Sequence, residues 1–386
     1  MQADVWTYSD LIGHALDYSG AATDAQSERF ARRAIQNAVN EMQGAKNWAY
    51  FYSVGQILTV APYSTGTITY DHSGGAYDRL VTLASGTWPT WAADGILVID
   101  NVTYQVATRQ SGTQITLSDS MNPGDDVAAG TSYTIYRDTY PIPLDCGSVG
   151  EVILQGQQAV LQYVPLATLM PNQATNLTQA QPSYYSLIGD PNRFAALSMR
   201  FDPAPDAAYN VKFTYRRRPR QLRVDLYDTG TASITNGSTT VTGSGTTWTS
   251  NMVGSIIRFS SGSTDVPTGI SGASPYVQER SIVGFTSATS MTLDADPQTT
   301  LSAVKYSISD PVDIETGAML TYFLREIERQ VRIIRRMKPT QDEEGYYRTA
   351  MMAAFEADSR MHGSRARLSV PLWGRRMADM PTGADI

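Results

Sequence analysis

An internal repeat of strand-like segments is the feature that most limits how this 386-residue chain can fold. Two series of short segments, rich in Thr, Gly and aliphatic residues, run in the same order along the chain. The first series comprises 65–68, 87–88, 95–98, 114–119 and 133–136, and the second comprises 229–232, 247–248, 254–257, 290–294 and 306–308. Matched positions are separated by 160 residues (Trp88 and Trp248) to 176 residues (Leu117 and Leu293), so the loops differ while the order of elements is kept.

Each series predicts a small β structure. Short strands separated by turn residues over roughly 80 residues are typical of a small barrel or sandwich. The competing interpretation is that Thr-Gly-rich strands resemble one another by chance. Composition favours β structure, because 17% of the residues are charged against about 25% in an average protein, and the chain holds 30 Gly and 22 Tyr. We expect β modules at 51–144 and 229–308.

The N-terminal residues are predicted to be helical. The segment 23–26 (Thr-Asp-Ala-Gln) has the pattern of a capping box, in which side chains satisfy the free amides at a helix start. Apolar residues then recur every four positions, at Phe30, Ala34, Ala38 and Met42. This spacing predicts a helix from about Asp24 to Lys46, with a shorter helix near 9–17 before it.

Helical signals near the other end of the chain are stronger. Asp310-Pro311 places a capping carboxylate before a proline at the first helical position, and Lys338-Pro339 marks the helix end. A second capping box at 340–343 opens a final helix. So short a turn predicts two antiparallel helices, an α-hairpin. The apolar stripe expected to pack the first of them consists of Leu320, Phe323, Leu324, Ile327, Val331 and Ile334.

These elements together predict an α+β fold. A helical core combines the N-terminal helices at 1–50 with the α-hairpin at 309–358, and the two β modules are inserted between them. The central segment 145–228 is expected to carry a β-hairpin with strands at 197–202 and 208–216. From about Ser359 the chain is basic and without periodicity, so 359–386 is expected to be an extended tail.

The cellular compartment follows from what the sequence lacks. The single cysteine, Cys146, cannot form an internal disulfide. The opening residues have neither the basic nor the apolar region of a secretory signal, and no apolar run approaches the ~18 residues of a membrane span. We therefore expect a soluble protein made in the cytoplasm, with no membrane partner.

Patterns that carry catalytic chemistry are missing from the sequence. The three histidines, His14, His72 and His362, are scattered, and no metalloprotease, nucleophile-elbow or P-loop motif occurs. The acidic pairs 125–126 and 294/296 lie in turns that contain Pro or Gly, where Asp commonly accepts hydrogen bonds from local amides. We therefore expect no enzymatic activity, no metal and no cofactor.

Net positive charge is concentrated in three segments of a chain whose total net charge is −7. The segment 212–223 carries +6, 322–338 carries +4 and 359–378 carries +5. Such segregation is typical of faces with separate partners. The alternative is that these residues are merely solvated, or complement the carbonyl end of a helix. The cluster Arg216, Arg217, Arg218 and Arg220 is a candidate for contact with DNA or with another subunit.

The basic tail has a pattern that favours docking. Aliphatic residues and a Trp alternate with other residues between arginines, which suits a segment that becomes ordered on a partner. The candidate contact residues are Arg365, Arg367, Leu368, Val370, Leu372, Trp373, Arg375 and Arg376.

The order of these elements resembles a known family. The relevant segments are 239–248 with Gly254, 65–70 through 133–140, and 182–185 with 203–209 and 215–217. With the helical ends and the basic tail, they are similar to the head-to-tail adaptor (connector) proteins of tailed bacteriophages, especially short-tailed ones.

The resemblance implies a structural virion protein at the head-to-tail junction. Twelve copies would form a ring beneath the portal, around the channel through which the genomic DNA passes. The C-terminal tail would insert into the portal protein. A tail nozzle or tube protein, and a tail fibre or spike, would be further partners.

Two other classes of function remain as alternatives. A tailspike-type structural protein would bind carbohydrate through exposed aromatic residues of the β modules, such as Trp88, Trp91 and Trp248. A hydrolase would use carboxylates in the β-module turns.

Overall fold

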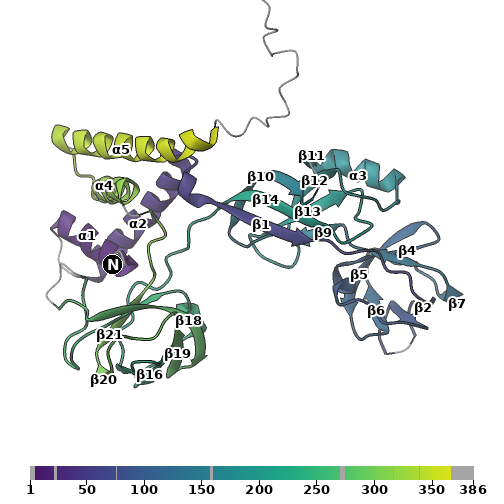
Figure 1. Ribbon diagram of the computed structural model, residues 1–386, viewed down its shortest axis with the longest axis horizontal. Coiled ribbons are helices and arrows are strands. Elements are labelled where there is room, and N and C mark those ends of the chain that lie inside the picture. Colours follow the sequence, from purple (N-terminus) through teal and green to yellow (C-terminus); the bar gives the residue numbers. More distant parts are fainter. Residues whose placement is uncertain are drawn as a thin grey trace, which may run out of the picture. The chain divides into compact units, whose positions relative to one another are not determined.

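The computed structural model describes residues 5–20, 24–74, 76–156, 160–269, 274–315, 317–338 and 340–366. The chain divides into two compact units (Figure 1): unit 1 comprises 1–50 and 219–386, and unit 2 comprises 51–218. Five α-helices and many short strands make up the described residues, so the predicted α+β class is confirmed. None of the helices in these ranges is long and apolar enough to cross a membrane.

Four helices belong to unit 1: α1 (Tyr8–Ser19), α2 (Ala25–Ala45), α4 (Ala318–Arg335) and α5 (Gln341–Ala366). The capping residue of α2 is Asp24, whose carboxylate accepts hydrogen bonds from the backbone N–H groups of Gln26 and Ser27, at 2.9 and 3.0 Å, and Thr23 of the predicted capping box lies outside the described residues. The capping box before α5 is present, because Thr340 N donates to Glu343 Oε2 at 2.9 Å and Glu343 N donates to Thr340 Oγ1 at 3.3 Å. Local side-chain chemistry thus sets these helix starts.

The predicted start of the C-terminal helical region was wrong. Helix α4 begins at Ala318, and Asp310 instead follows strand β21 (Tyr306–Ser309). The buried Asp310 carboxylate accepts hydrogen bonds from Arg223 N at 2.7 Å, Val224 N at 2.8 Å and Ser255 Oγ at 2.7 Å. The carboxylate therefore satisfies amides of the segment that enters the β module, and not those of a helix.

The predicted start of the tail at Ser359 was also wrong, since α5 continues to Ala366. Two contacts hold this end of the helix to the residues that follow α2: Lys46 Nζ lies 3.0 Å from Asp358 Oδ2, and Ala49 N donates to Asp358 Oδ1 at 2.6 Å. Residues 367–386 lie outside the described part of the chain.

Helix α4 is enclosed by α1, α2 and α5. Of the predicted packing stripe, Phe323, Ile327 and Val331 are buried, and Leu320, Leu324 and Ile334 are half-buried. The other side of α4 is buried too, because α5 crosses it. Figure 1 shows α4 close to end-on and α5 lengthwise, and the Tyr322 ring centroid lies 6.2 Å from that of Phe355.

The β part of unit 1 is one curled seven-stranded sheet. Its strands, in spatial order, are β20 (Leu301–Val304), β15 (Thr231–Ile234), β16 (Thr240–Ser244), β19 (Ser290–Leu293), β18 (Gln278–Ser287), β17 (Ile256–Phe259) and β21. Strands β20 and β21 follow each other in the chain yet lie at opposite edges of the sheet, so the sheet curls back on itself. Its interior is filled by a hydrophobic core that includes Trp248, Phe259 and Tyr306.

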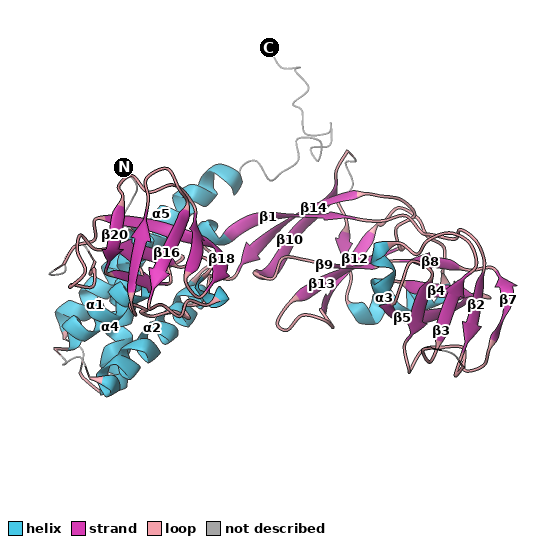
Figure 2. Cartoon of the chain, turned by 90° about the horizontal axis from the view of Figure 1, so that it is seen from below, coloured by secondary structure: helices cyan, strands magenta, loops and turns pink. Residues whose placement is uncertain are grey.

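Unit 2 contains a second sheet with the same topology (Figure 2). Its strands, in spatial order, are β7 (Val127–Thr131), β2 (Ile68–Asp71), β3 (Leu80–Leu83), β6 (Gln114–Leu117), β5 (Val102–Arg109), β4 (Ile96–Ile99) and β8 (Thr134–Tyr136). Each strand corresponds to the strand at the same place in the unit 1 sheet. The predicted internal repeat is therefore a repeat of structure.

One cluster of aromatic side chains recurs in both modules. In the first, Tyr133 OH donates to Thr65 O at 2.8 Å, and the Trp88 and Tyr133 ring centroids are 5.1 Å apart. In the second, Tyr306 OH donates to Thr229 O at 2.6 Å, and the Trp248 and Tyr306 centroids are 5.8 Å apart. The Thr-Trp signature in the sequence thus marks a core contact.

A further tyrosine of each module was not singled out from the sequence. Tyr63 OH accepts a hydrogen bond from Thr87 N at 3.1 Å, and Tyr227 OH accepts one from Thr247 N at 2.7 Å. Both tyrosines lie just before the first strand of their module, where the repeat is short and weakly patterned. Each one ties the loop that carries the Trp to the start of the module.

The rest of unit 2 forms a sandwich of two small sheets. The first consists of β1 (Tyr52–Leu58), β14 (Asn210–Arg217) and β10 (Cys146–Leu154), in that order. The second consists of β11 (Gln162–Tyr163), β12 (Tyr184–Gly189), β13 (Leu197–Asp202) and β9 (Thr139–Pro141), and helix α3 (Leu166–Thr175) follows β11. A core that includes Val211, Phe213, Tyr185 and Phe201 lies between them.

The predicted central β-hairpin was wrong, although both of its strands exist. Strand β13 pairs with β12 and β9, whereas β14 pairs with β1 and β10. The turn at 203–207 therefore carries the chain from one layer of the sandwich to the other. Strand β1, which the sequence placed with the first β module, belongs to the layer of β14.

Candidate interaction surfaces

Exposed apolar side chains gather on the sandwich of unit 2. Of 22 large hydrophobic side chains that are exposed in the described part of the chain, half lie there, although the sandwich is only one of four regions. The first β module has three, the second has four and the helices have four. The eleven are Tyr52, Val54, Leu58, Leu144, Ile153, Val160, Tyr163, Leu166, Met170, Tyr184 and Phe194. They lie on both sheets of the sandwich, on α3 and in the connecting loops, so the sandwich is the described region richest in exposed apolar side chains.

The turn between β12 and β13 presents one of these side chains. Phe194 is fully exposed, but the turn that carries it is held firmly. The Arg193 guanidinium donates to Asp190 Oδ2 at 2.8 Å and to the carbonyl oxygens of Ile142 and Leu197 at 3.2 Å. Ala195 has a φ of +56°, a left-handed conformation that the turn has to hold. Nothing in the sequence pattern indicated that this aromatic residue would be exposed.

The predicted arginine cluster is divided by the boundary between the two units, which falls after Arg218. In unit 2, Arg217 stacks on the Phe51 ring with its Cζ 5.4 Å from the centroid, and Arg218 Nη1 donates to Ala195 O at 3.0 Å. Arg216 is half-buried on β14. In unit 1, Arg220 Nη2 contacts Asp310 Oδ1 at 3.0 Å. Arg217, Arg218 and Arg220 therefore make contacts within the chain.

The positive charge of α4 faces carboxylates of the same chain. Arg325 pairs with Glu328 at 2.8 Å, Arg329 pairs with Glu326 at 3.0 Å and Arg332 pairs with Glu343 at 2.9 Å. Hydrogen bonds from Tyr18 and from Thr340 lower the pKa of Glu343 to about 2. These pairs favour a role within the helical bundle over an exposed basic face.

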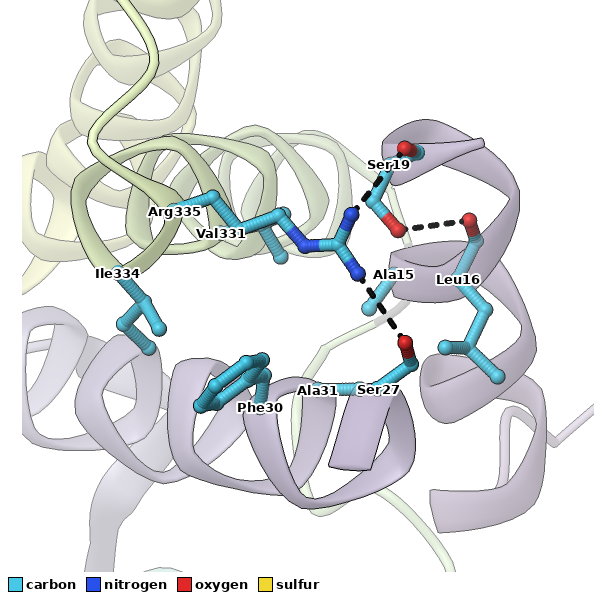
Figure 3. A pocket seen from close by; sticks show the side chains of 9 residues that line it. All are labelled: Ala15, Leu16, Ser19, Ser27, Phe30, Ala31, Val331, Ile334 and Arg335. Carbon is cyan, nitrogen blue, oxygen red and sulfur yellow. Dashed lines mark hydrogen bonds between the residues drawn. The ribbon is translucent and has the colours of Figure 1, made fainter. Parts of the chain in front are cut away.

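A hollow between α1, α2 and α4 is lined by two residues of the predicted stripe (Figure 3). Val331 and Ile334 face Phe30 across it, and the Arg335 guanidinium reaches Ser19 O at 3.5 Å and Ser27 Oγ at 3.3 Å. The hollow has a volume of about 10 Å³, which is room for about one water molecule. The hollow is a packing defect of the bundle and is too small for a ligand.

A larger cleft of about 590 Å³ lies within unit 2, between the first β module and the sandwich. Its charged side chains neutralise one another: Arg137 pairs with Asp94 at 2.8 Å, Arg200 with Asp138 at 2.8 Å, and Arg193 with Asp190 at 2.7 Å. Burial would raise the pKa of Asp190, but hydrogen bonds from Arg193, Ser198 and Asn192 lower it. The cleft is therefore lined by ion pairs.

In the described residues, the fold does not gather the His, Cys, Asp and Glu side chains into a metal site. Within the described ranges, no three His, Cys, Asp or Glu residues lie close enough to hold a metal ion. Asp126 Oδ1 accepts a hydrogen bond from His72 N at 2.8 Å, and Asp294 Oδ1 accepts one from Ser281 N at 3.0 Å. Both bonds join neighbouring segments of a module. Burial raises the pKa of the Cys146 thiol to about 11, so this thiol is a weak nucleophile.

Trp88 and Trp248 do not form an exposed binding surface. Both indoles are buried, with exposed fractions of 1% and 2%, and Trp91 is half-buried. The carbohydrate-binding alternative required exposed aromatic rings at these positions, so two of its three named residues are ruled out.

The predicted tail contacts lie almost wholly outside the described residues. Arg365 belongs to the last turn of α5, and Arg367, Leu368, Val370, Leu372, Trp373, Arg375 and Arg376 come after it, beyond the described part of the chain. No protein-family model matches this chain, and no curated protein matches it either.

Proposed function

We propose that this protein is a structural component of a phage virion, a head-to-tail adaptor without enzymatic activity. The observation that carries the proposal is the concentration of exposed apolar side chains on the unit 2 sandwich, together with the ion pairs that occupy arginines of α4 and of the unit 2 cleft. A surface of this kind suits an assembly subunit, since the centre of a protein interface is apolar and depleted in charge.

In the proposed assembly, twelve copies form a ring between the portal and the tail, with the DNA channel along its axis. The helices of unit 1, with α4 at their centre, are the core of each subunit, and the β modules are contact domains toward the tail proteins. The net charge of −7 suits such a channel, because a uniformly basic wall would bind DNA phosphates and slow the passage of the genome.

The ring is tested by negative-stain electron microscopy of the purified full-length chain, alone and mixed with the portal protein of the same phage. Rings or ring-on-portal particles are the expected result. Particles that stay single subunits when the portal is present in excess would contradict the proposal.

The C-terminal residues are proposed to dock into the portal. A chain ending at Ala366 keeps all of α5, including the Asp358 contacts with Lys46 and Ala49, and lacks the apolar and basic residues that follow. We expect this variant to fold with an unchanged circular dichroism spectrum and to lose co-purification with the portal. Normal co-purification would refute the docking role, whatever the result for the ring.

The cluster Arg216, Arg217, Arg218 and Arg220 is proposed to contact DNA or a neighbouring subunit. Arg216→Gln with Arg218→Gln distinguishes these roles, because loss of ring formation indicates a subunit contact and loss of DNA retention in intact rings indicates a channel contact. Arg220→Gln is a control for internal structure, since Arg220 already pairs with Asp310. If ring formation and DNA retention are both unchanged, the arginines of the cluster are merely solvated.

A further inference from the structure

Strand β1 is an open edge of the three-stranded sheet in unit 2. It is hydrogen-bonded to β14 on one side, and the sheet ends on its other side. The pairing runs through seven consecutive residues from Tyr52 to Leu58 without a register shift. Strand β1 contains no proline and no charged residue, which are the usual means by which proteins protect a sheet edge.

The direction of the free backbone groups follows from the register. Thr59 N donates to Tyr209 O at 2.9 Å, in line with the pairing of Leu58 and Asn210. In an antiparallel pair, hydrogen-bonded positions alternate, so the odd-numbered residues 53, 55 and 57 face β14. The N–H and C=O groups of Val54, Gln56 and Leu58 therefore point away from the sheet.

Side chains add to this edge. Val54 is 69% exposed and Leu58 is 64% exposed, and both lie on the outer face of the sheet with Gln56 between them. Ile57 points to the other face and is buried in the sandwich core. The edge therefore offers both backbone hydrogen-bonding groups and apolar side chains.

The other sheet edges in the described residues are protected. Strand β10 has two register shifts, and Ile153 is bridged by Val160. Strands β11 and β9 have two and three residues. The edges of β8 and β21 are covered by bridges from Tyr63 and Tyr227, and β7 and β20 each pair with a register shift. Strand β1 thus finds no long, regular edge on another copy except a second β1.

We propose that two copies of this chain pair through β1, antiparallel and related by a two-fold axis. The register centred on Gln56 places Val54 opposite Leu58 of the partner subunit and pairs the two Gln56 amides. In this register the outward backbone groups of both strands meet, and the two most exposed apolar side chains of the strand cover each other. The absence of charge on β1 removes the like-charge repulsion that opposes most self-pairing.

The pair is distinct from the proposed ring. A two-fold contact joins the same patch on both subunits, whereas neighbours around a cyclic ring meet through two different patches. The inference therefore stands without the ring, and each can fail alone. The pair is assigned to the free protein.

Sedimentation velocity of the full-length chain tests the pairing. The wild type is expected to show a concentration-dependent dimer. Val54→Lys is expected to raise the dissociation constant of the dimer about tenfold, because the substitution alters both of the Val54–Leu58 pairs that the two-fold axis relates. Gln56→Pro removes an outward N–H while sparing the bonds to β14, and it is expected to weaken the dimer with an unchanged circular dichroism spectrum. Val283→Lys, at a 54% exposed strand position of unit 1, is the control.

A cysteine cross-link tests the register. The only native cysteine is buried, so Gln56→Cys gives a single exposed thiol, and hydrogen-bonded partners about 5.5 Å apart at Cα are within disulfide range. With oxidised glutathione as oxidant, this variant is expected to form a covalent dimer, and Gln36→Cys, exposed on α2, is expected not to. A wild type that stays monomeric, a dimer unaffected by both β1 substitutions, or equal cross-linking of the two variants would overturn the proposal.

Discussion

Asp310 is the residue on which the entry to the second β module depends. Its carboxylate is 1% exposed and is surrounded by two backbone N–H groups, the Ser255 hydroxyl and the Arg220 guanidinium. Burial would raise the pKa of Asp310, but these hydrogen bonds lower it. The charged carboxylate is therefore favoured by folding.

Replacing this carboxylate is expected to loosen unit 1. Asp310→Asn keeps the shape but removes the charge, which leaves Arg220 without its ion-pair partner, at a cost of about 3 kcal/mol. Hydrogen–deuterium exchange on the full chain, read on peptides covering β17 and β21, measures the effect. Asp265→Asn, at an exposed loop position, is the control and is expected to change exchange by little.

The lowered pKa of Asp310 also predicts a pH dependence. A group with a lowered folded-state pKa stabilises the fold above its unfolded-state pKa of about 3.9, and this contribution is lost as the pH falls through the folded-state value. The stability difference between wild type and Asp310→Asn is therefore expected to be full near pH 6 and to shrink below pH 4. A difference that stays constant down to pH 2 would assign the effect to packing.

The two repeated tryptophans differ in one polar contact. Trp248 Nε1 donates to Tyr306 OH at 3.0 Å, whereas the structure has no acceptor for Trp88 Nε1 among the described residues. Trp248→Phe is therefore expected to destabilise its module by about 1 kcal/mol more than Trp88→Phe destabilises the other. Amide exchange on the strands of each module compares the two, and equal losses would show that the hydrogen bond contributes nothing.

At the scale of elements, α4 shows what a helical period can and cannot predict. The spacing of its apolar residues identified Phe323, Ile327 and Val331 as buried, because one face of any amphipathic helix must be covered. The burial of Glu326 and Arg332 on other faces was not predictable. Arg332 depends on α5, because it pairs with Glu343, which in turn accepts a hydrogen bond from Tyr18 of α1. Glu326 is bonded by Arg329 and Gln330 of α4 itself.

Two isoleucines of α4 give a matched test of this burial. Ile327 is fully buried and Ile333 is 55% exposed. Ile327→Ala is expected to cost about 2–4 kcal/mol of unfolding free energy through lost contacts and a cavity, and Ile333→Ala about 0.5 kcal/mol or less. Urea unfolding followed by circular dichroism measures both. Similar losses for the two would mean that α4 is not the centre of the bundle.

At the scale of the whole molecule, the two units differ in how the chain builds them. Unit 2 is one continuous stretch, 51–218, with two hydrophobic cores of its own. Unit 1 joins the ends of the chain, and α2 packs on α4 from across nearly three hundred residues.

This difference predicts how fragments behave. Residues 51–218 expressed alone are expected to fold, with dispersed amide NMR signals and a cooperative urea transition, because their cores are complete. Residues 1–50 alone are expected to stay unfolded, because the apolar face of α2 is covered by α4. A disordered 51–218 fragment would show that unit 2 depends on unit 1.

The amino-acid sequence by itself determined the features that arise from short-range chemistry. Helix starts at Asp24 and Thr340 follow from side chains that cap amides two or three residues away. The two β modules follow from turn residues and alternating strands that recur in the same order, with Trp88 and Trp248 as matched core residues.

Only the tertiary structure decided how segments far apart in the chain combine. Whether β13 and β14 form a hairpin or enter two layers depends on β1 and β12, which compete for the same backbone groups. Asp310 has the local pattern of a helix cap, yet in the folded chain its carboxylate accepts hydrogen bonds from the backbone N–H groups of Arg223 and Val224. The same holds for exposure, since the open edge of β1 and the exposed ring of Phe194 depend on which strands and turns leave them uncovered.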